Sequence, residues 1–191
     1  ARFEYFNDMP RHAAAMGSTL ISRGSSPNES AVDAVDARPI TDADGVRIGF
    51  VQSLADGIAP RKPGSEVAAN CCKAYNEHIA ALPATQPLTS ADGEKKLASF
   101  KLDQARKPTD YADVTFASAA VRRDADGKTY CSINNIGDGM VLHINALTKA
   151  ISVLSAARYV QDADGYLTTA RIKNYQPEQI DSPRVEVNEN D

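Results

Sequence analysis

The chain has 191 residues, with 21 Lys and Arg against 25 Asp and Glu, so its formal net charge is −4. Hydrophobic residues make up 42 % of the sequence, which is typical of a globular protein, and the length suits one domain or two small ones. No apolar run reaches the roughly 20 residues that a membrane span requires, and no cluster of Lys and Arg marks a nucleic-acid surface. We therefore expect neither a membrane nor a nucleic acid as a partner.

The three cysteines, Cys71, Cys72 and Cys131, do not fit a disulfide framework, because their number is odd and two of them are adjacent. We expect them to be buried thiols in a reducing compartment. This compartment makes a cytoplasmic location our expectation. The first residues lack both an initiator Met and the apolar core of a signal peptide, so we expect that the chain was trimmed or processed before Ala1. We divide the chain into an N-terminal extension over 1–17 and one domain over 18–191.

Strand-like segments lie before and after two consecutive helices. The predicted strands cover 19–22, 31–35, 46–54, 114–121, 129–136, 140–145 and 150–154. The first predicted helix runs over 65–82, with Ser65 as its N-cap and Pro83 after its end. Its apolar face is formed by Val67, Cys71, Tyr75, Ile79 and Leu82.

The second predicted helix runs over 91–106 and turns Leu97 and Phe100 toward the core, with Leu102 as a further candidate. Because strands follow one another through hairpins and only this helix pair interrupts them, we expect an antiparallel α+β fold. No β-α-β alternation is present, so a doubly wound parallel sheet is not expected.

The tetrad Asp-Ala-Asp-Gly occurs three times, at 42–45, 124–127 and 162–165, each time between two strand-like segments. Asp begins such a turn by bonding its own backbone, and Gly closes it with a positive φ, so we predict three hairpin loops. The alternative is a calcium loop. An EF-hand loop needs Gly at its sixth position, Glu at its twelfth and flanking helices, and none of the three tetrads meets this requirement.

Two further Asp-Gly pairs, at Asp56 and Asp138, follow apolar strands directly. An aspartate at the end of a buried strand costs free energy unless its charge is matched. A divalent cation is a suitable match, and the glycine beside it lets a backbone carbonyl approach as another ligand. The alternative is that both pairs are Asx turns without a metal.

Five short motifs follow one another in a recognisable order. They are Asn28-Glu29-Ser30, Ala55-Asp56-Gly57, the helix start at 64–69, the strand at 115–119, and Asn135-Ile136-Gly137-Asp138. This succession resembles the metal-dependent protein serine/threonine phosphatases of the protein phosphatase 2C family, over about 18–160.

The resemblance implies an antiparallel β-sandwich flanked by helix pairs (α-β-β-α), here incomplete at the C-terminus. It implies two Mn²⁺ or Mg²⁺ ions, with Asp56 bridging them as the catalytic residue and Gly57 contributing its carbonyl. Glu29 would hold one ion through water, and Asp138 would belong to a third, weaker metal site. The implied reaction is hydrolysis of phosphoserine or phosphothreonine in a protein by a water that the two metals activate.

The sequence departs from the family pattern at three places. Ser30 stands where the family has an aspartate, and Ser25 stands where it has a phosphate-binding arginine. Two further aspartate motifs of the family do not occur before Asp191. The sequence therefore leaves two functions open: a protein phosphatase, or a catalytically inactive phosphatase-like module that binds or regulates a protein partner. A third reading is an unrelated hairpin-rich α+β domain.

Overall fold

The largest unit of the molecule is a five-stranded antiparallel sheet in the order β11-β6-β5-β4-β3. The computed structural model describes residues 4–5, 16–17, 34–58, 62–105, 113–161, 164–165 and 167–188. The strands of the large sheet are β3 (Ala34–Thr41), β4 (Arg47–Ile58), β5 (Asp113–Arg123), β6 (Thr129–Ile136) and β11 (Arg184–Val187). The predicted strand at 19–22 lies outside the described residues.

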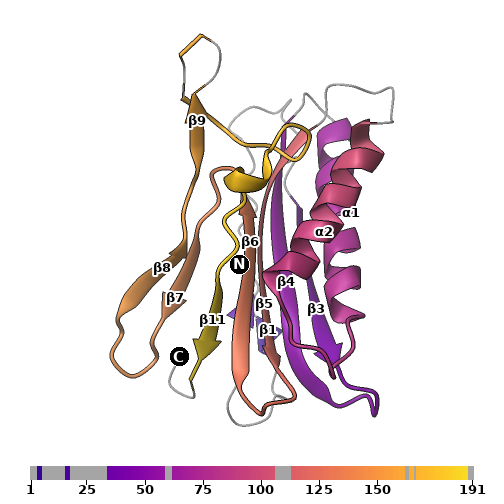
Figure 1. The fold of residues 1–191 in the computed structure, drawn as a ribbon, viewed down its shortest axis with the longest axis vertical. Helices are drawn as coiled ribbons and strands as arrows, with labels where there is room; N and C mark the ends of the chain where they lie inside the picture. The colour runs from indigo at the N-terminus through magenta and orange to yellow at the C-terminus, as the bar shows by residue number, and fades with distance from the viewer. Residues whose placement is uncertain are drawn as a thin grey trace.

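Three two-stranded antiparallel sheets accompany the large one. They pair β1 (Glu4–Tyr5) with β2 (Met16–Gly17), β7 (Val141–Ile144) with β8 (Ile151–Ser155), and β9 (Tyr159–Gln161) with β10 (Leu167–Thr169). A short 3-10 helix, η1 (Pro177–Gln179), precedes β11. In Figure 1 the β7–β8 hairpin lies on the side of the large sheet that is farther from the helices.

Two helices, α1 (Lys62–Ala80) and α2 (Ser90–Ala105), cover one face of the large sheet (Figure 1). α1 packs on β3, β4 and β5, whereas α2 packs on α1 and β6. Neither helix is long and apolar enough to cross a membrane, a finding that extends only to the part of the chain the structure describes.

The core lies between these helices and the sheet. Alternating strand positions point toward the helices, and the buried residues there include Ile40, Val51, Ala55, Phe116 and Ile136. From the helices, the core receives Cys71, Tyr75, Ile79, Leu97 and Phe100. The rings of Tyr75 and Phe116 are in contact, with centroids 4.9 Å apart.

The structure confirms the predicted α+β class with its antiparallel sheet and helix pair. The hairpins at 42–45 and 124–127 connect β3 to β4 and β5 to β6, and the third tetrad lies between β9 and β10, as predicted. Gly45, Gly127 and Gly165 all have positive φ values, which explains why glycine ends each tetrad.

Two local predictions about the helices are wrong. Ser65 does not cap α1, because the helix begins three residues earlier at Lys62, where Pro63 is tolerated in the first turn. Leu102 is 60 % exposed, whereas Leu97 and Phe100 are buried as expected. The buried face of α2 contains Gly93, Leu97 and Phe100. Leu102 lies outside this face and is exposed to solvent.

A buried ion pair joins the helix connection to the sheet. The side chain of Arg122 is fully buried at the end of β5, and its Nε donates to Oδ1 of Asp124 at 2.8 Å. Arg122 also donates to the carbonyl oxygens of Pro83 and Gln86 between the helices. The backbone N–H of Leu88 in turn donates to Oδ2 of Asp124 at 3.0 Å.

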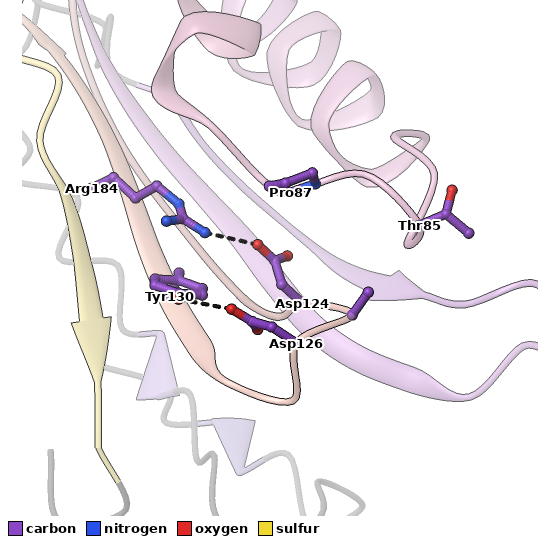
Figure 2. A pocket seen from close by; sticks show the side chains of 7 residues that line it. Thr85, Pro87, Asp124, Asp126, Tyr130 and Arg184 are labelled. Atoms are coloured by element: carbon purple, nitrogen blue, oxygen red, sulfur yellow. Dashed lines mark hydrogen bonds and ion pairs between the residues drawn. The ribbon is translucent and has the colours of Figure 1, made fainter.

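Arg184 on β11 completes this cluster (Figure 2). Its Nη2 donates to Oδ2 of Asp124 at 2.9 Å, its Nε donates to the carbonyl oxygen of Leu88, and its guanidinium stacks on the ring of Tyr130 at 3.5 Å. The Tyr130 hydroxyl donates to Asp126 in the hairpin. Asp124, Asp126, Tyr130 and Arg184 line a cavity of about 240 Å³. Because every one of these charged groups has a partner within the fold, we interpret the cluster as structural.

We predict that Asp124→Asn destabilises the fold by about 3–5 kcal/mol, because it leaves the buried Arg122 guanidinium without a counter-charge. Equilibrium unfolding in urea measures the change. The control is Glu186→Gln, which removes the exposed ion pair between Glu186 and Lys128 and should destabilise the fold far less, because solvent screens this pair. Equal losses in the two variants would contradict the structural role of the buried pair.

Candidate functional site

Asp56 and Gly57 lie within β4, not after it. The predicted strand ended at Leu54, but pairing with β5 continues to Ile58, with Asp56 opposite Thr115. Along β4 the residues Ser53, Ala55 and Gly57 are buried, whereas Asp56 is exposed, so its carboxylate lies on the face turned away from α1. The expectation that burial forces a cation onto this aspartate is therefore wrong, since solvent reaches the carboxylate.

Asp138 lies in a tight loop that follows β6. Gly137 precedes it with φ +109°, a backbone conformation that L side chains rarely adopt. A Cβ at Gly137 would lie 2.6 Å from Cβ of Thr115, so the loop approaches β5 more closely than a side chain permits. Asp138 itself is exposed. The glycine before it is therefore required by contact with the neighbouring strand.

The side chain of Asn135 holds this loop in place. Its Nδ2 donates to the carbonyl oxygen of Gly139 at 2.8 Å, to Oγ of Ser155 at 2.9 Å and to the carbonyl oxygen of Ala156 at 3.4 Å. Asn135 is buried, so these bonds satisfy its Nδ2 donors where water cannot reach, whereas its buried Oδ1 has no hydrogen-bond partner among the described residues. The asparagine of the sequence motif thus fixes the segment on which Asp138 lies.

The fold brings Asp56 and Asp138 to the same end of the large sheet. Thr115 on β5 is paired with Asp56 on one side and contacts Gly137 on the other. Two strand spacings, about 10 Å, separate β4, which carries Asp56, from β6, which leads into the Asp138 loop. Two segments that are 82 positions apart in the sequence therefore present carboxylates to one region.

Asp113 is a third carboxylate at this end, and the sequence patterns did not identify it. It opens β5 opposite Ile58, so it lies on the same face as Asp56. Burial raises the pKa of Asp113, although hydrogen bonds from the backbone N–H groups of Lys173 and Val114 oppose the shift. The predicted strand began one residue later, at 114, which left this carboxylate out of the pattern.

A cation also lies next to the Asp138 loop. The backbone N–H of Arg158 donates to the carbonyl oxygen of Gly137 at 3.0 Å, and its guanidinium pairs with Asp181 at 2.8 Å. The pKa of Asp181 lies below its ordinary value. Partial burial alone would raise this pKa, but hydrogen bonds to the carboxylate, including the one from Arg158, outweigh that effect. No sequence signal distinguishes Arg158, because the contact depends on how 156–158 folds back onto the loop.

The described residues supply part of the ligand set that the resemblance implies. Glu29 lies outside the described residues, so its predicted role is untested. Within the described part of the chain, no three His, Cys, Asp or Glu side chains gather closely enough to hold a metal ion. The available donors, a carboxylate on Asp56 and another on Asp138 with nearby backbone carbonyls, have the hard oxygen chemistry that Mg²⁺ and Mn²⁺ prefer.

The cysteines offer no alternative nucleophile. Cys71, Cys72 and Cys131 are all free and buried, as predicted. Burial raises the pKa of Cys72 and of Cys131 to about 11, and it raises the pKa of Cys71 well above its ordinary value. A thiol must ionise to attack a substrate, so these three side chains are inert at neutral pH.

Comparison with known proteins gives matches only at the level of structure. No family model matches the sequence, and no curated protein matches it. A bacterial serine phosphatase superimposes with a TM-score of 0.58 at 12 % identity, over 83 % of this chain and 68 % of that chain. A mutant of a bacterial serine phosphatase superimposes with a TM-score of 0.59 at 14 % identity, over 96 % of this chain and 70 % of that chain.

The serine/threonine phosphatase Stp1 from Staphylococcus aureus gives a TM-score of 0.56 at 12 % identity, over 97 % of this chain and 70 % of that chain. Superpositions at such low sequence identity establish the fold of the chain but not its activity. The chain therefore has the fold of bacterial serine/threonine phosphatases, which confirms the fold expected from the order of its motifs.

We predict that Gly137→Ala destabilises the protein by about 2–4 kcal/mol, because the new methyl group meets Thr115 and the positive φ is retained. Thermal unfolding followed by circular dichroism measures the loss. Gly45→Ala is the control, since Gly45 has φ +79° but nothing within 4 Å of the added Cβ, and it should cost only about 1 kcal/mol. Equal costs would contradict the close approach.

We predict that none of the three thiols reacts with Ellman's reagent at pH 8 in the folded protein. With a pKa of about 11, only about one Cys131 side chain in a thousand is ionised at that pH. The thiolate fraction rises only as the pH approaches the folded-state pKa. Unfolding in guanidinium should release three equivalents, and rapid reaction of one equivalent before unfolding would contradict the burial.

Proposed function

We propose that this chain is a metal-dependent protein serine/threonine phosphatase domain that acts on phosphorylated proteins. One observation carries the proposal: in a chain with a phosphatase fold, Asp56 and Gly57 lie at the same sheet end as the Asp138 loop. Two of the five motifs that suggested this chemistry, those of Asp56 and Asp138, thus lie at one end of the sheet, which supports the proposal. A cytoplasmic location remains part of the proposal.

In the proposed site, Asp56 and the carbonyl of Gly57 are ligands to Mn²⁺ or Mg²⁺, Glu29 supports one ion through water, and Asp138 serves a weaker third site. Bound divalent cations supply Lewis-acid activation of a water for in-line attack on phosphorus. The chain positions its own candidate ligands by strand pairing and by a side-chain amide. β-pairing with Thr115 fixes Asp56, and the Asn135 amide fixes the loop of Asp138.

The charge of the chain favours a site that binds cations before it binds a phosphorylated substrate. The chain carries a net charge of −4, and two exposed carboxylates mark the site, so it repels a phosphorylated peptide unless cations intervene. Cations at Asp56 would reverse the local sign and leave the phosphate as their natural counter-charge. Arg158, held by Asp181 beside the loop, adds a positive group nearby.

A second candidate is a catalytically inactive phosphatase-like module that binds or regulates a protein partner. It is favoured by the absence, among the described residues, of any three metal-binding side chains within reach of one ion. Ser30 and Ser25, which replace an aspartate and an arginine of the family pattern, point the same way. In this case Asp56 and Asp138 would be solvated surface carboxylates.

We predict that the chain binds Mn²⁺ in isothermal titration calorimetry and that Asp56→Asn weakens binding at least about tenfold, because one ligand charge is lost. Asp44→Asn is the matched control. Asp44 is an exposed aspartate in the hairpin at the other end of β4, and its replacement should leave binding unchanged.

Phosphate release from a phosphoserine peptide, measured with and without Mn²⁺, separates the two candidates. Turnover that requires Mn²⁺ and is lost in Asp56→Asn supports the enzyme. Mn²⁺ binding without turnover supports the inactive module. No Mn²⁺ binding by the parent chain would overturn the metal-dependent phosphatase.

A further inference from the structure

A surface cavity of about 500 Å³ opens beside the Asp138 loop, and its volume is typical of ligand pockets. The cavity is lined by Arg158, Tyr159, Glu178 and Gln179. The backbone N–H of Arg158 donates to the carbonyl oxygen of Gly137 at 3.0 Å, so one wall of the cavity is anchored directly to the loop that carries Asp138. The cavity is therefore a neighbour of the candidate site.

Groups of the protein already engage the guanidinium of Arg158. Its Nη2 donates to Oδ1 of Asp181 at 2.8 Å, and its Nη1 donates to the carbonyl oxygen of Glu178 at 3.2 Å. The ion pair with Asp181 offsets the positive charge that Arg158 brings to the cavity. Among the charged groups of the lining, the carboxylate of Glu178 is therefore the one whose charge is not offset.

The side chains of Tyr159 and Glu178 are open to a ligand. Tyr159 is 59 % exposed, and Glu178 is also exposed. Within the part of the chain that the structure describes, neither side chain makes a hydrogen bond or an ion pair. An aromatic face and a carboxylate both attract a cation. The lining therefore fits an ammonium or guanidinium group better than an acidic one.

We propose that this cavity binds a lysine or arginine side chain that flanks the phosphorylated residue of a protein substrate. The inference rests on the proposed function and adds a substrate class to it, phosphorylated residues in a basic sequence. The stem of the basic side chain would lie along the ring of Tyr159, and its charged end would pair with Glu178. An extended peptide advances about 3.3 Å per residue, so residues two or three positions from the phosphorylated one can reach a neighbouring cavity.

Three phosphoserine peptides test the proposal. They differ only at the positions two and three residues before and after the phosphoserine, which are all lysine, all alanine or all glutamate. Changes on both sides cover either direction of the peptide. We expect Mn²⁺-dependent phosphate release to favour the lysine peptide over the alanine peptide about tenfold in kcat/KM, through a lower KM.

Variants of the lining locate this preference. Glu178→Gln and Tyr159→Ala should each reduce it to about threefold, and the double variant should abolish it, because each removes one of two attractions for the cation. Tyr159→Phe should keep it, since the ring is retained. Glu186→Gln is the matched control. It removes an exposed carboxylate on β11, away from the cavity, and should keep the preference.

Three results would overturn the inference. The first is equal kcat/KM for the lysine and alanine peptides. The second is a preference for the glutamate peptide, which would mean that Arg158 and not Glu178 governs the cavity. The third is a lysine preference that survives in the double variant, because another surface would then recognise the basic residues.

Hydrolysis of p-nitrophenyl phosphate by the parent chain reports the proposed function separately, because this compound has no flanking residues. A parent that hydrolyses neither this compound nor the peptides would overturn the proposed function. Fluorescence anisotropy of the labelled lysine peptide then decides the inference by itself. Weaker binding by Glu178→Gln than by the parent and Glu186→Gln supports the cavity, and equal binding by all three overturns it.

Discussion

The buried ion pair between Arg122 and Asp124 joins three parts of the chain that lie far apart in the sequence. Arg122 lies next to the last residue of β5, and its guanidinium donates to carbonyl oxygens in the connection between the helices. Asp124 accepts the backbone N–H of Leu88 from that same connection. Arg184 brings in β11 through the second oxygen of Asp124. The cost of burying these charges is met only when helices, hairpin and edge strand are all in place.

This cluster fixes the pairing register of β5 at one end of the sheet. The same register determines where the residues of the candidate site lie at the other end. β5 runs from Asp113 to Arg123, so the residues that pair with β4 and β6 at its far end are fixed once its last residues are fixed. A shift of one residue in this pairing would turn Asp56 toward α1 and into the core. The position of the carboxylate therefore depends on contacts that lie a full strand length away.

Much of the fold could be predicted because its signals are local. The three tetrads specify turns through the hydrogen bonding of aspartate and the positive φ of glycine, and the helical spacing of Cys71, Tyr75 and Ile79 indicates one buried face. The predicted ends of the helices and strands were less accurate than their predicted types. Ser65 has the chemistry of an N-cap, yet the helix begins at Lys62, and β4 continues through Asp56 because β5 is long enough to pair with it.

For the candidate site, too, some properties follow from the sequence and others only from the tertiary structure. The sequence by itself determined which residues have ligand chemistry, since the types and order of Asp56, Gly57 and Asp138 are visible in one dimension. Only the tertiary structure decided that Asp56 is solvated, that Asp113 and Arg158 lie nearby, and that the apolar residues of β7 and β8 face outward. The physical reason is that exposure and proximity arise from strand register and packing between distant segments, which no local pattern encodes.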